Sequence, residues 1–163
     1  MEFMVALAIG MIAIGALASL SLYSGRAFAG LMNYTDLENK SRTALDLMTK
    51  EIRQTLLVTT YTTNTIVFTD YDGQPLSYNF NPTNQTLVRT KAGVSTTLLT
   101  GCNSLEFSIY QRNGITGTFD QYPASSVTNT KVVKVSWLCK RSILDTKLNT
   151  ESVETAKIVI RKN

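Results

Sequence analysis

The most constraining feature of this sequence is a long uncharged segment with a carboxylate at its edge. No charged residue and no proline occur from Phe3 to Leu22, and Glu2 stands directly before that segment. A helix of about 20 apolar residues is long enough to cross the ~30 Å hydrocarbon core of a bilayer. Any fold of this chain must therefore place the helix in lipid or against other protein surfaces, and must accommodate Glu2 there.

Two interpretations of the segment follow from the residues alone. A cleavable secretory signal would explain its apolar character, and Ala27-Phe28-Ala29 resembles an A-x-A cleavage site. The segment is long for a signal peptide, however, and no basic residues precede it. A single-pass membrane anchor explains the length, with Glu2 simply lying at the membrane interface.

A third interpretation rests on a resemblance. Residues 2–10, E-F-M-V-A-L-A-I-G, resemble the start of type IV pilins and type II secretion pseudopilins, and the similarity extends to about Gly15. In that family a cleaved leader peptide and an N-methylated mature end precede the glutamate. Here Met1 directly precedes Glu2, so processing and methylation are implied by the resemblance alone. The resemblance implies a structural subunit whose apolar helices pack together in a filament.

The resemblance also assigns roles to residues. Glu2 would set the axial register by meeting the N-terminal amine of a neighbouring subunit, because a carboxylate in apolar surroundings is costly unless it is paired. The helix would lie in the inner membrane before assembly and in the filament core afterwards. Small residues along it would permit close helix approach. The residues expected to pack in the core are Phe3, Val5, Leu7, Ile9, Gly10, Ile12, Ile14, Gly15, Leu17 and Leu20.

The helical pattern continues beyond the apolar segment. Residues 23–57 contain no proline, and from Leu37 the apolar residues recur at helical spacing on one face. We therefore predict one helix over residues 2–57, roughly 80 Å long, whose second half packs on a head formed by residues 58–163. The stripe consists of Leu37, Ala44, Leu45, Met48, Ile52 and Leu56.

Short β-type runs separated by turn residues predict an antiparallel meander in the head. The fold class is therefore α+β, with a long N-terminal helix on an antiparallel sheet. Residues 112–130 are expected to form a long irregular loop. The turns and strands of residues 68–90, F-T-D-Y-D-G-Q-P-L-S-Y-N-F-N-P-T-N-Q-T-L-V-R-T, a following leucine pair and residues 105–111, L-E-F-S-I-Y-Q, are similar to the heads of PilW-like minor pilins and pseudopilin J. The expected strands are 65–69, 76–80, 86–90, 95–99, 105–110, 132–138 and 156–160.

The two cysteines, Cys102 and Cys139, flank two candidate neighbouring strands. If the head lies outside the cytoplasm they predict a disulfide, and two buried free thiols are the alternative. The sequence has no histidine, so no metal site is expected. Residues 70–73, D-Y-D-G, resemble the opening of a calcium loop, but a hairpin turn explains Asp72-Gly73 fully.

Nothing in the sequence indicates catalysis or a cofactor. No nucleophile stands in a triad, and no P-loop or Rossmann turn is found. The C-terminal part is basic and could meet DNA or acidic surfaces of neighbouring subunits, and a solvated charged face is favoured over DNA binding. The net charge of the whole chain is only +4.

The sequence thus predicts a pilin-like structural subunit. It would polymerise into an extracellular, type IV pilus-like filament, a fimbrium. Its partners would be copies of itself, other pilins, the inner membrane and the assembly machinery. Two alternatives stay open. One is a minor pilin or pseudopilin at a filament tip, in type II secretion or pilus priming. The other is a membrane-anchored periplasmic binding module.

Overall fold

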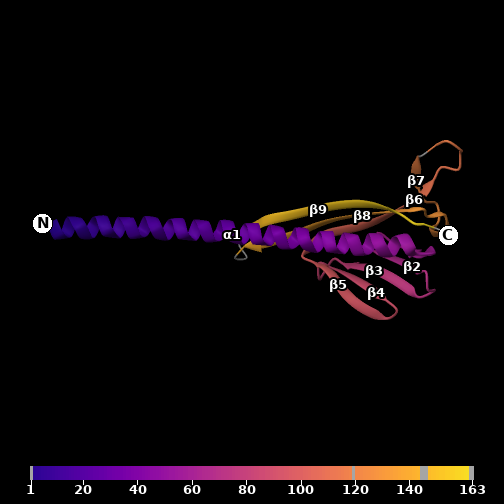
Figure 1. Cartoon of the computed structure of the whole chain (residues 1–163), viewed down its shortest axis with the longest axis horizontal. Coiled ribbons are helices and arrows are strands. Elements are labelled where there is room, and N and C mark those ends of the chain that lie inside the picture. Colours follow the sequence, from indigo (N-terminus) through magenta and orange to yellow (C-terminus); the bar gives the residue numbers. More distant parts are fainter. Residues whose placement is uncertain (1, 119, 144–146, 162–163) are drawn as a thin grey trace.

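A computed structural model describes residues 2–118, 120–143 and 147–161 of the 163-residue chain. One helix, α1 (Glu2–Gln54), runs along the whole molecule, and its N-terminal half projects alone beyond the strands (Figure 1). Two antiparallel sheets flank its C-terminal half, on opposite sides of the helix in the view of Figure 1. The predicted α+β class is confirmed.

Helix α1 ends three residues before the expected position. The backbone N–H of Thr55 donates to the carbonyl of Ile52 at 3.3 Å, and its hydroxyl donates to the same oxygen at 2.8 Å. The backbone N–H of Arg161 donates to the carbonyl of Arg53 at 3.3 Å. These bonds satisfy carbonyls that a helix end leaves without partners. Leu56 consequently lies beyond the helix and is exposed.

The first sheet is a five-stranded meander in the order β1-β2-β3-β4-β5. Its turn at residues 70–73 is the predicted hairpin, closed by the backbone N–H of Gly73 donating to the carbonyl of Asp70 at 3.0 Å. Strand β1 was not predicted, because its residues were assigned to the helix end and to a loop. The strands are β1 (Leu57–Tyr61), β2 (Thr65–Thr69), β3 (Pro75–Asn81), β4 (Thr86–Lys91) and β5 (Val94–Thr100).

The second sheet has the order β7-β6-β8-β9. The expected loop at 112–130 is partly wrong, since it contains β7, which pairs with the end of β6, and a short 3-10 helix, η1 (Val127–Asn129). The chain also forms two sheets where a single meander was expected. The strands are β6 (Cys102–Arg112), β7 (Gln121–Pro123), β8 (Val132–Ile143) and β9 (Lys147–Val159).

The predicted disulfide between Cys102 and Cys139 is present, and both residues are buried. They are directly opposite each other in the β6–β8 register. Gly101, at φ +72°, stands next to this link, and a Cβ there would lie 2.9 Å from the carbonyl oxygen of Lys140. Only glycine fits this position without a shift of the backbone.

The core lies between the C-terminal half of α1 and the two sheets. The predicted stripe is confirmed at Leu37, Ala44, Met48 and Ile52, which are at most 2% exposed, and Leu45 packs against them. The helix contacts β9, β8 and β5. The sheets contribute large side chains to the same core, among them Phe68, Leu76, Tyr78, Leu87, Phe107, Val133, Val135 and Ile158.

Candidate assembly surface and a charged groove

The N-terminal half of α1 has no partner within the described chain. Every residue from 2 to 28 is exposed, and Gly10 and Gly15 have no atom near the position of an added Cβ. The helix nevertheless continues through both glycines without a break. The large residues expected to pack in a core are all exposed: Phe3 80%, Val5 59%, Leu7 47%, Ile9 62%, Ile12 74%, Ile14 69%, Leu17 66% and Leu20 65%.

Glu2 lies in the first turn of α1 and is exposed. A carboxylate at this end of a helix interacts favourably with the positive end of the helix dipole. Within a single described chain, the helix dipole is what stabilises the Glu2 carboxylate. The pairing of Glu2 with a neighbouring amine therefore stays a prediction.

The exposed apolar surface extends further than the sequence predicted. Large apolar side chains beyond Leu22 are also in solvent, with Phe28 at 65%, Leu31 at 63%, Met32 at 72% and Tyr34 at 51% exposed. Leu31 stands about 14 Å beyond Leu22 along the helix axis. These side chains lie between the predicted membrane segment and the head, and residue spacing gave no reason to single them out.

Helix α1 is long and apolar enough to cross a membrane, as judged by length and composition. None of its most apolar window is buried within the chain, unlike the core helix of a globular domain. A bilayer of ~30 Å would cover the segment up to about Leu22. It would leave the apolar side chains from Phe28 to Tyr34 outside the hydrocarbon.

A buried cluster of charges joins the other half of the helix to the first sheet, and the sequence analysis missed it. The Arg89 side chain pairs with Glu51, with Nε donating to Oε2 at 2.8 Å. The hydroxyl of Tyr78 donates to the same Oε2 at 2.6 Å. Lys91 approaches Glu51 at 3.9 Å and forms an ion pair with buried Asp70.

Burial and hydrogen bonding act in opposite directions on the pKa of Glu51 at the centre of this cluster. Burial raises the pKa of Glu51, but hydrogen bonds from Arg89 and Tyr78 and the nearby positive charges outweigh it and lower the pKa below the ordinary 4.5. Burial, together with the Glu51 carboxylate, raises the pKa of Tyr78. The hydrogen bond to Asp70 raises the pKa of Lys91. Glu51 is therefore held ionised and Tyr78 neutral.

One signal in the sequence could have revealed these polar positions. Ser41 and Glu51 are buried on the helical stripe, at spacings that continue the series Leu37, Ala44, Met48. The hydroxyl of Ser41 accepts a hydrogen bond from the Trp137 indole N–H at 3.2 Å. Polar residues in phase with an apolar stripe thus indicate buried partners on the facing sheet.

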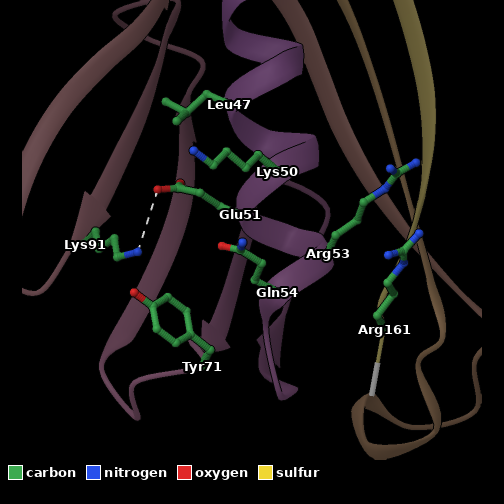
Figure 2. A pocket seen from close by; sticks show the side chains of 8 residues that line it. All are labelled: Leu47, Lys50, Glu51, Arg53, Gln54, Tyr71, Lys91 and Arg161. Atoms are coloured by element: carbon green, nitrogen blue, oxygen red, sulfur yellow. Dashed lines mark ion pairs between the residues drawn. The ribbon is translucent and has the colours of Figure 1, made fainter. Parts of the chain in front are cut away.

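The end of α1 also borders an open groove, shown in Figure 2. Its cavity of about 570 Å³ lies between the helix, the β2–β3 turn and the residues that follow β9. Glu51 and Lys91 face each other on one wall, and Arg53 and Arg161 lie near each other on the other (Figure 2). The lining residues are Leu47, Lys50, Glu51, Arg53, Gln54, Tyr71, Lys91 and Arg161.

Several basic residues of the C-terminal part have partners among the described residues. Lys140 pairs with Glu151 at 2.8 Å, and Arg141 reaches Asp36 of the helix at 2.9 Å. Lys157 lies over the ring of Tyr110 at 5.7 Å. Lys162 and the side chain of Lys147 lie outside the described part of the chain.

No protein-family model matches this sequence, and no curated protein matches it as a relative. The pilin resemblance of residues 2–15 therefore stays an expectation from that motif. The exposed N-terminal half of α1 and the groove are the two surfaces of the described chain that are open to a partner or ligand.

Proposed function

We propose that this protein is a structural subunit of a type IV pilus-like filament, held in the inner membrane before assembly and polymerised through α1. The observation that carries the proposal is the length of the exposed apolar surface. Interrupted by Ser24 and Arg26, it extends from Phe3 to Tyr34, whereas a bilayer covers only the part up to about Leu22. A plain anchor would leave several large apolar side chains in water.

Packing against copies of the same helix would cover the whole surface. The small residues Gly10 and Gly15 allow helices to approach closely, and none of the residues that the structure describes lies beside them. Repeated contact between different faces of identical subunits gives an open helical polymer. The head would then form the outer surface, with the disulfide suited to an oxidising location.

Glu2 provides the test of this proposal. In lipid or in a packed helical core an unpaired carboxylate is costly, so its pairing would select one axial register. We expect Glu2→Ala to reduce incorporation into sheared filaments at least about tenfold, while membrane insertion of the variant persists. Asp46→Asn is the control, because Asp46 is an exposed carboxylate on the head half of the same helix.

The opposite result has a definite meaning. If Glu2→Ala and Asp46→Asn both leave the distribution of the chain between membrane and filament unchanged, Glu2 does not set register. If the chain is in addition found only in the membrane fraction, the protein is a membrane-anchored module. If the chain is present in filaments only in trace amounts, and Glu2→Ala abolishes that trace, the minor-pilin or pseudopilin assignment replaces the major one.

A further inference from the structure

The groove at the C-terminal end of α1 carries positive charges that no described residue neutralises. Lys50, Arg53 and Arg161 line it, and none of the three forms an ion pair with another described residue. Lys91, also in the groove, is different because Asp70 and Glu51 already neutralise it. The groove therefore has unpaired cations on one side and a satisfied cluster on the other.

The fold brings two of these cations together by a backbone contact. The N–H of Arg161, just after β9, donates to the carbonyl of Arg53 in the last turn of α1 at 3.3 Å. The two guanidinium groups consequently lie close to each other at the edge of the groove (Figure 2). Like charges held in this way repel each other unless an anion lies between them.

Helix-end electrostatics explains only part of this arrangement. Cations in the last turn of a helix interact favourably with its dipole, which accounts for Arg53. Arg161 belongs to the segment after β9 and has no such explanation. A second cavity, of about 380 Å³, adjoins the first and shares Lys50, Arg53, Gln54 and Arg161 with it. The one exposed carboxylate at its rim is Asp46.

We propose that this groove binds a phosphate or sulfate ester, with Arg53 and Arg161 as the principal ligands. Guanidinium groups bind tetrahedral oxyanions through paired, charge-assisted hydrogen bonds. Gln54 supplies a neutral amide donor, and Lys50 a further positive charge. Tyr71 is 63% exposed on the opposite wall, with the Lys91 ammonium 5.6 Å from its ring centroid, and the rest of its ring could contact the organic part of an ester.

The position of the groove makes it accessible. It lies at the far end of α1 from the exposed apolar half, so neither a membrane nor packed helices around residues 2–34 would cover it (Figure 1). The ester could be a free solute or a group displayed on a polymer. This inference does not depend on the filament proposal and would hold for a membrane-anchored monomer as well.

Isothermal titration calorimetry on the full chain in nonionic detergent tests the site, in a phosphate-free buffer of low ionic strength. Inorganic phosphate and phenyl phosphate are the probes, and acetate is the comparison anion. We expect saturable binding of both phosphates at one site, with phenyl phosphate tighter and acetate at least about tenfold weaker. Arg53→Gln and Arg161→Gln should each weaken phosphate binding about tenfold.

Arg26→Gln and Arg42→Gln are the matched controls. Each removes one exposed positive charge from the same helix but lies far from the groove, and neither should change binding more than about twofold. Inorganic polyphosphate distinguishes the sources. If polyphosphate binds much more tightly than phosphate and this binding is lost in both groove variants, the ligand is a polymer. If polyphosphate and phosphate bind with equal affinity, the ligand is a free ester. The absence of saturable phosphate binding, equal binding of acetate, or equal losses in the control variants would overturn the proposal.

Discussion

The two halves of α1 share one continuous helix and differ in where their partners are. Residues 2–28 are mostly apolar and all exposed, whereas the second half buries a single stripe against two sheets. The polar residues of the second half include Ser41 and Glu51, each bonded to a side chain of the head. In the first half, Ser19 bonds only to the backbone carbonyl of Gly15 within its own helix, at 2.9 Å.

This difference shows what each half needs. The stripe of the second half is buried within the chain itself, so substitutions in this stripe should lower the folding stability. The first half contributes nothing to that core, so substitutions in it should affect only membrane insertion or assembly. Three pairs of residues of the same type, one in each half, allow this to be measured on one helix, with unfolding followed in detergent micelles.

The largest difference is expected for the methionines. Met48 is fully buried, while Met11 is 63% exposed. Met48→Ala should lower the free energy of unfolding by about 3 kcal/mol, because it leaves a cavity in the core. Met11→Ala should change it by less than about 0.5 kcal/mol. Denaturant unfolding followed by Trp137 fluorescence gives both values, and similar losses in the two variants would mean that the first half is also part of the folded core.

The carboxylates are the second pair. Glu51→Gln should lower the free energy of unfolding by about 2 kcal/mol, because Arg89 then loses its partner in a site that is only partly open to water. Glu2→Gln should change it by less than about 0.5 kcal/mol, since the carboxylate is exposed. Guanidinium would screen the ion pairs, so urea melts are the suitable measurement. An equal, small effect of both variants would show that the Glu51 cluster contributes no net stability.

The Glu51 cluster also predicts a dependence on pH. The pKa of Glu51 in the folded chain lies below the ordinary value of 4.5, so the unfolded chain binds more protons. The stabilisation is therefore fully present above about pH 5 and is lost as the pH falls through the folded-state pKa. Urea melts between pH 3 and 7 should show this loss in the native chain and a weaker loss in Glu51→Gln. Parallel profiles of the two proteins would assign the acid sensitivity to other groups.

The serines give the smallest difference. Ser41→Ala should lower the free energy of unfolding by about 1 kcal/mol, because the buried indole N–H of Trp137 loses its acceptor. Ser19→Ala should leave it unchanged or raise it slightly, since alanine is the better helix former. A shift in the fluorescence spectrum of Trp137 in the first variant alone would confirm the cause. No difference between the variants would mean that another group satisfies the indole.

Local patterns predicted much of this fold. The spacing from Leu37 to Ile52 predicted the buried face of α1, and alternation predicted most strands. Strand β1 was missed because its residues directly follow the helix and have little alternation, and β7 because three residues give too short a pattern. The division into two sheets depends on pairings far apart in sequence, which local patterns do not encode.

The candidate functional surfaces also differ in how far the sequence alone could predict them. The apolar segment could be read from residues 3–22 because composition alone defines it. The extension to Tyr34 could not, because it depends on where the head stops covering the helix. The groove could not be predicted either, since Arg53 and Arg161 are joined only by the return of the chain after β9 to the end of α1.

The most direct test of the central claim is to image filaments sheared from cells that produce this chain and to measure the intact mass of their dominant protein. We predict that this chain dominates, that its N-terminus is processed, and that the density shows residues 2–34 of neighbouring subunits packed together. A chain that stays in the membrane fraction, with no filament containing it, would contradict the account.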